Sequence, residues 1–191
     1  CSSLYAARPL STEDTGTVDA GHLEIELGYE FSKMDSKEHT LSFVSTFGIL
    51  QNLDASIEIP YLFIKNKNED DENGFGDLEM GIKLRLLKEK GSIPSLALKF
   101  KIKTDTGDES KELGSDDIDY QINSILSKNF TKNTTLHLNI GYTFIGESSS
   151  DDVFNYSFAL ENFVNDKLNL VGELSGETTF EGGFDDNPFE V

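Results

Sequence analysis

The chain has 191 residues, which is enough for one domain of ordinary size. It carries 16 Lys and Arg residues against 35 Asp and Glu residues, a formal net charge of −19. This balance disfavours nucleic acid as a partner, because phosphate binding needs concentrated cations. It does not exclude a membrane protein whose acidic residues lie in loops outside the bilayer. The 14 Phe residues indicate a folded chain, since disordered chains are poor in aromatic residues.

The first seven residues, Cys1 to Ala7, are small and apolar, and a polar stretch starts at Arg8. We interpret residues 1–7 as the remnant of a secretory signal peptide with cleavage near Ala6 or Ala7. The alternative makes Cys1 a lipidated anchor. A single cysteine excludes an internal disulfide and a Cys-based zinc site. No run approaches 18 consecutive apolar residues, so no transmembrane helix is predicted.

Apolar and polar residues alternate along nine segments, which predicts strands with two different faces. The expected strands are roughly 8–11 residues long, close to the 9–11 that a tilted membrane-spanning strand needs and longer than the average globular strand. Segments 118–126, 154–160 and 168–174 show the weaker alternation. In chain order the segments are 22–31, 41–49, 55–63, 78–86, 96–103, 118–126, 136–144, 154–160 and 168–174.

The two faces of these segments are typical of a transmembrane β-barrel. The polar face carries charges but is also rich in Gly, Ser, Thr and Asn. Several segments end in aromatic residues, as bilayer-spanning barrel strands do at the membrane interfaces. These aromatic residues are Phe31, Tyr61, Phe63, Tyr142 and Phe144.

The connections between the segments alternate in length and charge. Short connections at 50–53, 87–93, 129–134 and 163–167 alternate with longer ones. The long connections are acidic and lie at 64–76, 104–117, 145–152 and 177–187. An up-and-down barrel has short periplasmic turns and longer outer loops, so we expect every acidic loop on the outer side. These loops either keep the rim solvated, or they bridge divalent cations to lipopolysaccharide or bias the entrance toward cations.

The fold class predicted is therefore all-β, an antiparallel up-and-down transmembrane β-barrel. Single-chain bacterial barrels have even strand numbers, whereas nine strands are visible. We expect a single barrel domain over 8–191 that is truncated at the C-terminus, with about three more strands completing a barrel of about twelve.

Several motifs resemble one known family. They are Arg8-Pro9-Leu10-Ser11-Thr12 and the residues up to Val18, Ile59-Pro60-Tyr61, Gly74-Phe75-Gly76-Asp77 continuing to Lys83, Lys103-Thr104-Asp105-Thr106-Gly107, and Leu113-Gly114-Ser115 followed by Asp119-Tyr120. Their order and spacing over roughly residues 8–176 resemble the outer-membrane proteins of the MetA-pathway of phenol degradation family. The fourth motif departs from the family pattern by lacking a Pro. The resemblance implies an outer-membrane barrel that passes small, hydrophobic or aromatic molecules, and it carries no catalytic residues.

Charged residues cluster on the predicted polar faces of 78–86 and 96–103. Like charges directly opposite each other are destabilising, so we expect acidic residues nearby. If the polar face is the lumen, these charges either pack as pairs or set ion selectivity. The lumen-lining candidates are Glu24, Glu26, Glu30, Glu58, Lys83, Arg85, Lys99, Lys101, Lys103, Asp119 and His137.

We expect no metal, cofactor or catalytic site. The three His residues lack zinc spacing, no nucleophile elbow or phosphate loop occurs, and nothing singles out one Ser as a nucleophile. The motifs Gly76-Asp77 and Gly114-Ser115-Asp116-Asp117 indicate turn chemistry. Acidic loop residues offer oxygen ligands for calcium, although no EF-hand spacing occurs. Those candidates are Asp70, Asp71, Glu72, Asp116 and Asp117.

Three functions fit the sequence. The first is an outer-membrane channel of a Gram-negative bacterium, with passive diffusion of small molecules through the lumen. The second is a structural or surface-interaction barrel whose acidic loops act outside the cell and whose lumen is plugged. The third is a soluble or lipid-anchored ligand-binding barrel, which needs the apolar face inside. Expected partners are outer-membrane lipid, lipopolysaccharide and a small-molecule cargo, without nucleic acid.

Overall fold

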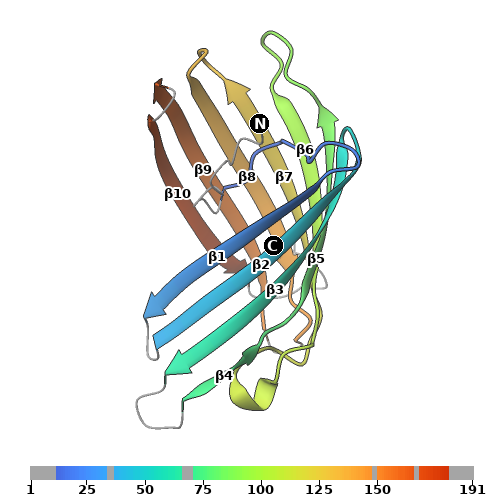
Figure 1. The fold of residues 1–191 in the computed structure, drawn as a ribbon, viewed down its shortest axis with the longest axis vertical. Helices are drawn as coiled ribbons and strands as arrows, with labels where there is room; N and C mark the ends of the chain where they lie inside the picture. Colours follow the sequence, from blue (N-terminus) through green and yellow to red (C-terminus); the bar gives the residue numbers. More distant parts are fainter. Residues whose placement is uncertain (1–11, 34–36, 66–70, 148–149, 166–167, 181–191) are drawn as a thin grey trace, which may run out of the picture.

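The computed structural model describes residues 12–33, 37–65, 71–147, 150–165 and 168–180. These form ten strands and one short 3-10 helix, η1 at Glu109–Lys111 (Figure 1). The described part has no helix long or apolar enough to span a bilayer. The strands are β1 (Leu23–Lys33), β2 (Lys37–Leu50), β3 (Leu53–Lys65), β4 (Glu72–Phe75), β5 (Glu79–Leu87), β6 (Ser95–Lys103), β7 (Asp119–Asn129), β8 (Thr134–Phe144), β9 (Asp152–Asn165) and β10 (Leu168–Phe180).

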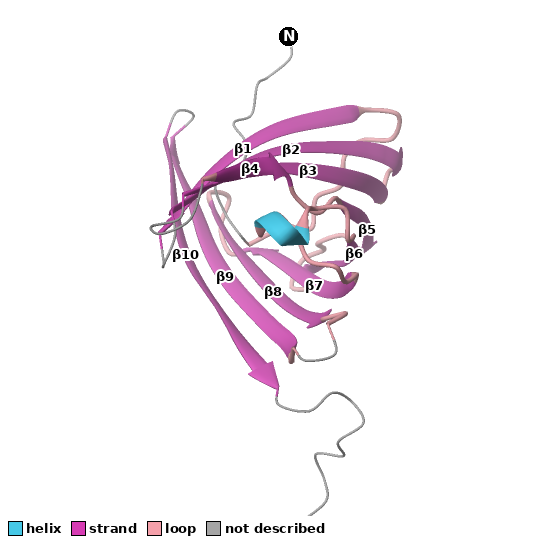
Figure 2. Ribbon diagram, turned by 90° about the horizontal axis from the view of Figure 1, so that it is seen from below, coloured by secondary structure: helices cyan, strands magenta, loops and turns pink. Residues whose placement is uncertain are grey.

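All strands belong to one antiparallel sheet in which neighbours in sequence are neighbours in space. The order is β1-β2-β3-β5-β6-β7-β8-β9-β10, and β4 pairs with β3 beside this path. The sheet curls into a half-barrel whose edges are β1 and β10 (Figure 2). The predicted all-β, antiparallel, up-and-down fold is thus confirmed. The total of about twelve strands stays a prediction.

The nine predicted strands are all present, and several are longer than predicted. For example, β2 begins at Lys37 instead of 41, and β10 continues to Phe180. Strand β4 lies inside the connection predicted as a loop at 64–76. Its sequence Glu-Asn-Gly-Phe has no apolar alternation, and it pairs with the end of β3 through Tyr61↔Phe75 and Phe63↔Asn73.

The alternation of short and long connections is confirmed. Residues 51–52 link β2 to β3, and residues 130–133 link β7 to β8, whereas residues 104–118 with η1 link β6 to β7. In Figure 1 η1 and β4 lie at the lower end, and the β5–β6 and β7–β8 turns lie at the upper end. The acidic connections therefore gather at one rim of the half-barrel.

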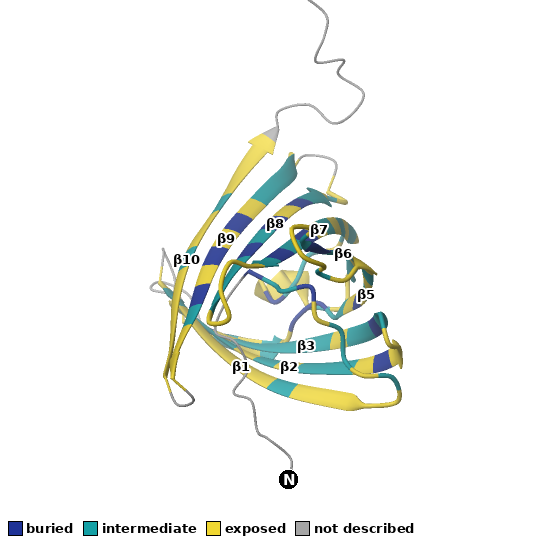
Figure 3. Ribbon diagram, turned by 90° about the horizontal axis from the view of Figure 1, so that it is seen from above, coloured by how far each residue is buried: buried dark blue, intermediate teal, exposed yellow. Residues whose placement is uncertain are grey.

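The polarity of the sheet is the reverse of a soluble sandwich. Successive strand residues point to opposite faces, and here the apolar set lies outside: Leu27 is 78% exposed and Leu174 is 75% exposed. In the described chain only five hydrophobic residues are buried, namely Ile64, Ala97, Leu113, Ile125 and Ala159. Buried and exposed positions alternate along strands such as β9 (Figure 3), and many of the buried ones are polar. They include Asp54, Ser95, Ser127, His137, Asn139, Ser157 and Glu161.

Several sequence predictions fall outside the described residues. These are the signal-peptide remnant 1–7, the lipid-anchor alternative at Cys1, the calcium candidate Asp70 and most of the loop predicted at 177–187.

Candidate functional site: the polar concave face

Four lysines form a cluster on the concave face, as their alternation predicts. Lys83 of β5 lies directly opposite Lys99 of β6 in the ladder, and Lys101 and Lys103 follow on β6. All four side chains are half-buried. Because directly opposed like charges repel, this arrangement requires carboxylates between them.

The carboxylates that neutralise this cluster come from three parts of the chain. Glu13 lies between the opposed lysines, with its carboxylate 2.5 Å from Lys99 Nζ and 3.7 Å from Lys83 Nζ. Lys101 Nζ is 2.8 Å from Glu79 Oε2. Lys103 Nζ is 2.6 Å from Asp119 Oδ2, the one counter-charge that the sequence predicted correctly.

The other predicted lumen candidates form no ion pair with this cluster among the described residues. The described ion pairs of the four lysines do not include Glu24, Glu26, Glu30 or Glu58. Glu26 nevertheless lies close enough to Lys83 and Lys99 to interact with them electrostatically. Glu24 and Glu30 are exposed on the edge strand β1, and Glu58 lies opposite Glu79 in the ladder. Arg85 lies at the short-turn end, where its Nη2 donates to the Gln51 carbonyl at 2.6 Å.

A segment before the first strand crosses the concave face, which alternation did not reveal. We call residues Thr12–Val18 the strap. The backbone N–H and hydroxyl of Thr12 donate to Glu173 of β10. The Glu13 N–H donates to Asn139 Oδ1 at 2.9 Å, and Asn139 Nδ2 donates back to the Glu13 carbonyl at 3.0 Å. The strap therefore joins the inner face of β10 to that of β8.

The remaining strap contacts reach the other side of the half-barrel. The Thr15 N–H donates to Ser127 Oγ of β7 at 3.1 Å, and the Val18 N–H donates to Asp54 Oδ2 of β3 at 3.0 Å. Thr12 is 2% exposed and Thr15 is 5% exposed. These irregular backbone groups are buried, so the side chains of the concave face supply the partners that no ladder provides.

The predicted lumen residue His137 is part of a buried polar network. Its Nδ1 is 2.8 Å from Ser127 Oγ, and its Nε2 is 3.7 Å from Glu161 Oε2. A Ser–His–acid set is the composition of a hydrolase triad. Here Ser127 is 7% exposed and its Oγ also accepts the Thr15 N–H, so the hydroxyl anchors the strap instead of facing a substrate.

Asp77 organises the long connection after β6. Its carboxylate accepts hydrogen bonds from the Gly107 N–H at 2.7 Å and the Ser115 N–H at 2.8 Å. A Cβ at Gly107 or Gly114 would lie within 2.9 Å of Asp77 Oδ1, so both glycines permit this close approach. The turn chemistry predicted for Gly76-Asp77 and Gly114-Ser115 thus forms one structure that holds residues 107–115.

The described acidic residues of the rim do not converge as metal ligands. Within the described ranges no group of three or more His, Cys, Asp or Glu residues is arranged to hold a metal ion. This covers the calcium candidates Asp71, Glu72, Asp116 and Asp117. Glu109 hydrogen-bonds to Asp116, and that bond together with the negative charge of Asp116 raises the pKa of the Glu109 carboxyl.

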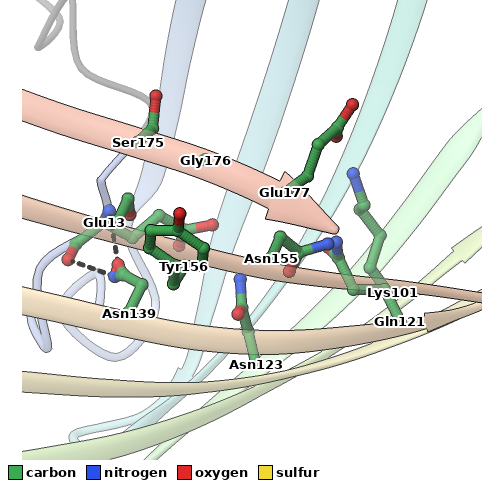
Figure 4. Close-up of a pocket in the computed structure, with 11 residues that line it drawn as sticks. Glu13, Lys101, Gln121, Asn123, Asn139, Asn155, Tyr156, Ser175, Gly176 and Glu177 are labelled. Carbon is green, nitrogen blue, oxygen red and sulfur yellow. Dashed lines mark hydrogen bonds between the residues drawn. The ribbon is translucent and has the colours of Figure 1, made fainter. Parts of the chain in front are cut away.

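A cavity of about 500 Å³ lies against the concave side of β6–β10. Its wall is rich in carboxamides: Gln121 and Asn123 from β7, Asn139 from β8, and Asn155 from β9 (Figure 4). Because these occupy inward positions on neighbouring strands, the sequence carried the signal, but alternation marked them only as polar.

The comparison with protein families matches residues 6–187 to the family described as "Putative MetA-pathway of phenol degradation". The chain belongs to this family. The match covers nearly the whole chain, including the strap, the lysine cluster and the carboxamide cavity. It therefore confirms the resemblance inferred from the motifs between residues 8 and 176. No curated protein matches the chain. The family description associates the chain with phenol degradation.

Proposed function

We propose that this chain forms an outer-membrane β-barrel whose concave face lines a passive route for small molecules. The observation that carries the proposal is the reversed polarity of the sheet. Leu27 and Leu174 lie fully on the outer face, while His137 and Asn139 are 3% and 4% exposed on the inner face. Exposed apolar surface on this scale favours lipid as the solvent of the outer face, since soluble monomers rarely expose large apolar patches.

The lengths of the strands and the positions of their aromatic residues agree with a bilayer. Strands β1, β7 and β8 have 11 residues each, near the 9–11 that a tilted strand needs. At the rim with the long connections, Tyr61 packs against Phe63 and Phe75 with ring centroids 5.0 and 5.1 Å apart. At the same rim, before the connection from β8 to β9, Tyr142 and Phe144 pack with ring centroids 4.9 Å apart. Aromatic residues at this level are typical of the membrane interface.

For the cargo we propose small molecules that include phenolic compounds, the class that the family description suggests. The concave face is polar and its lysines are paired, so a purely hydrophobic cargo finds little apolar lining there. The soluble ligand-binding alternative needs the apolar residues inside, and the exposed outer face does not support it.

The test combines localisation and transport in the intact protein. Outer-membrane fractionation, with gel mobility compared before and after boiling, should place the protein in the outer membrane with heat-dependent mobility. Proteoliposomes should then swell in solutions of small neutral solutes. A soluble protein with unchanged mobility would reject the barrel, and an outer-membrane protein without swelling would reject the channel.

The strap favours a second candidate, a structural or surface-interaction barrel with a plugged lumen. The strap is hydrogen-bonded to β3, β7, β8 and β10 and so obstructs part of the concave face. In that case the acidic loops interact outside the cell, with lipopolysaccharide as a partner through divalent cations. Intact outer-membrane localisation without conductance or swelling favours this candidate.

A further inference from the structure

The carboxamide cavity combines a defined volume with hydrogen-bonding groups that the strands leave unused. Asn139 is occupied by the strap, because it both donates to and accepts from the Glu13 backbone. Gln121 and Asn155 each donate one N–H to Thr143 Oγ1, at 3.0 and 3.2 Å. Each primary carboxamide has two N–H donors and an acceptor oxygen, so Gln121 and Asn155 keep capacity for a ligand.

Asn123 has an oxygen that lacks a hydrogen-bond donor within the described residues. This atom, Oδ1, is buried. A buried acceptor without a donor costs free energy, so such groups are normally satisfied by protein, water or ligand. Figure 4 shows the Asn123 and Asn155 side chains side by side at the cavity. The Asn123 oxygen is enclosed over Gly141, so a ligand in the cavity meets the rest of the carboxamide.

Gly141 makes this arrangement possible. It lies between Asn123 of β7 and Asn155 of β9 in the ladder. A Cβ on Gly141 would lie 2.2 Å from Asn123 Oδ1 and 2.1 Å from Asn155 Oδ1. Both carboxamides therefore occupy the space over Gly141, and any side chain there displaces them.

The ionic groups of the wall are compensated within the protein. Lys101 is paired with Glu79, and Glu13 is paired with Lys99. Glu177 of β10 lies at the exposed border of the cavity. An anionic ligand thus meets no uncompensated cation among these pairs, whereas a neutral ligand with hydrogen-bonding groups matches the carboxamides.

We propose that the cavity over Gly141 is a binding site for small neutral molecules bearing hydroxyl groups, with the carboxamides of Gln121, Asn123 and Asn155 as its hydrogen-bonding wall. A hydroxyl both donates and accepts, which fits a wall of carboxamides. Both phenols and polyols supply this chemistry. The inference rests on the proposed function, because it names the solute class for which the concave face is selective.

The test measures binding to the intact protein in detergent micelles, which does not require transport. The probes are phenol, glucose and benzoate, and their binding is detected by saturation-transfer difference NMR. Heat-dependent gel mobility checks the folding of each variant. Phenol, glucose or both should bind, and the Asn123→Leu variant should weaken binding about tenfold, the loss of one net hydrogen bond. Gly141→Ala should weaken it at least as much. Asn162→Leu, on β9 but outside the cavity wall, should leave it unchanged.

The outcomes separate the possible ligands and the two proposals. Binding of phenol alone identifies an aromatic alcohol, and binding of glucose alone identifies a polyol. Benzoate that binds as well as phenol, or hydroxyl probes that bind Asn123→Leu and Gly141→Ala as they bind the native protein, would overturn the inference. Swelling of proteoliposomes without probe binding also overturns it and leaves the channel intact, whereas binding without swelling retains the site and rejects the channel.

Discussion

Replacing Gly48 by Ala should push the end of the strap at Val18, and the following residue Asp19, away from strand β2. A Cβ at Gly48 would lie 2.1 Å from the Asp19 carbonyl oxygen and 2.5 Å from the Val18 carbonyl oxygen. Both obstacles are backbone atoms, so a rotamer change cannot relieve the clash. The displaced segment also loses the hydrogen bonds Gly21 N–H to Gly48 O (2.8 Å) and Gly48 N–H to His22 O (3.0 Å).

The expected loss follows from these contacts. Overpacking a tight site typically costs about 1–3 kcal/mol, and each lost hydrogen bond costs about 0.5–1.5 kcal/mol. Since shifting the segment relieves part of the overlap, we expect Gly48→Ala to lower the free energy of unfolding by about 2–3 kcal/mol. The protein has no Trp, so urea unfolding of the refolded protein in micelles is followed by far-UV circular dichroism.

Gly172→Ala is the matched control. Gly172 also lies within a strand, β10, and a Cβ there meets no atom within 4 Å. This variant should be neutral or slightly stabilising, because Ala loses less conformational entropy on folding than Gly. Equal unfolding midpoints for Gly48→Ala and Gly172→Ala would refute the close packing of the N-terminal segment on β2.

Three further predictions concern the loop, the lumen and pH. Asp77→Ala should lower stability by about 1.5–3 kcal/mol, the scale of a hydrogen bond to a charged group, and expose residues 107–115 to limited proteolysis. Reversing Lys99 and Lys101 to Glu should shift the reversal potential of reconstituted channels toward cation selectivity, since lumen charges tune selectivity. Hydrogen bonds from Lys128 and from the Asn129 backbone lower the pKa of Glu89. Glu89 therefore stabilises the fold above its unfolded pKa, and this contribution is lost as pH falls through its lowered folded pKa. Glu89→Gln should therefore flatten the pH dependence of the urea unfolding midpoint between about pH 6 and pH 3.

Each of these predictions has a control or an outcome that contradicts it. Asp151→Ala changes an exposed loop carboxylate and should leave proteolysis of residues 107–115 unchanged. A reversal potential that does not move in the double Lys variant would show that paired charges only pack in the lumen. Glu112→Gln alters an exposed carboxylate in the connection after β6. If it flattens the pH profile as much as Glu89→Gln does, the assignment to Glu89 is rejected.

The strands were predictable because their physical signal is local. Leu23, Ile25, Leu27, Tyr29 and Phe31 all point outward from β1, and two-residue periodicity shows this without a structure. The lengths of the connections likewise predicted which rim carries the acidic residues. Strand β4 escaped prediction because its pairing depends on contact with Tyr61 and Phe63, residues of another strand.

The interior was harder to predict because it depends on tertiary contacts. Glu13 lies in no strand, so no periodic pattern links it to Lys83 and Lys99. Ile125 is fully buried although it shares the inner face with polar neighbours, whereas the apolar residues of β7 that alternation marked lie outside. Gly141 and Asn123 are ordinary strand residues in the sequence. Their contact could not be predicted, because it depends on the alignment of β7, β8 and β9.

Lipid contact of the outer face is the central claim, and fluorescence quenching tests it most directly. In a Cys1→Ser background, single cysteines replace Leu27, Leu174 or the half-buried inward residue Thr46, each labelled with a fluorophore, and the protein is reconstituted into vesicles. Brominated lipid should quench the labels at positions 27 and 174 and spare the label at position 46. Equal quenching at all three positions, or quenching confined to position 46, would contradict the account.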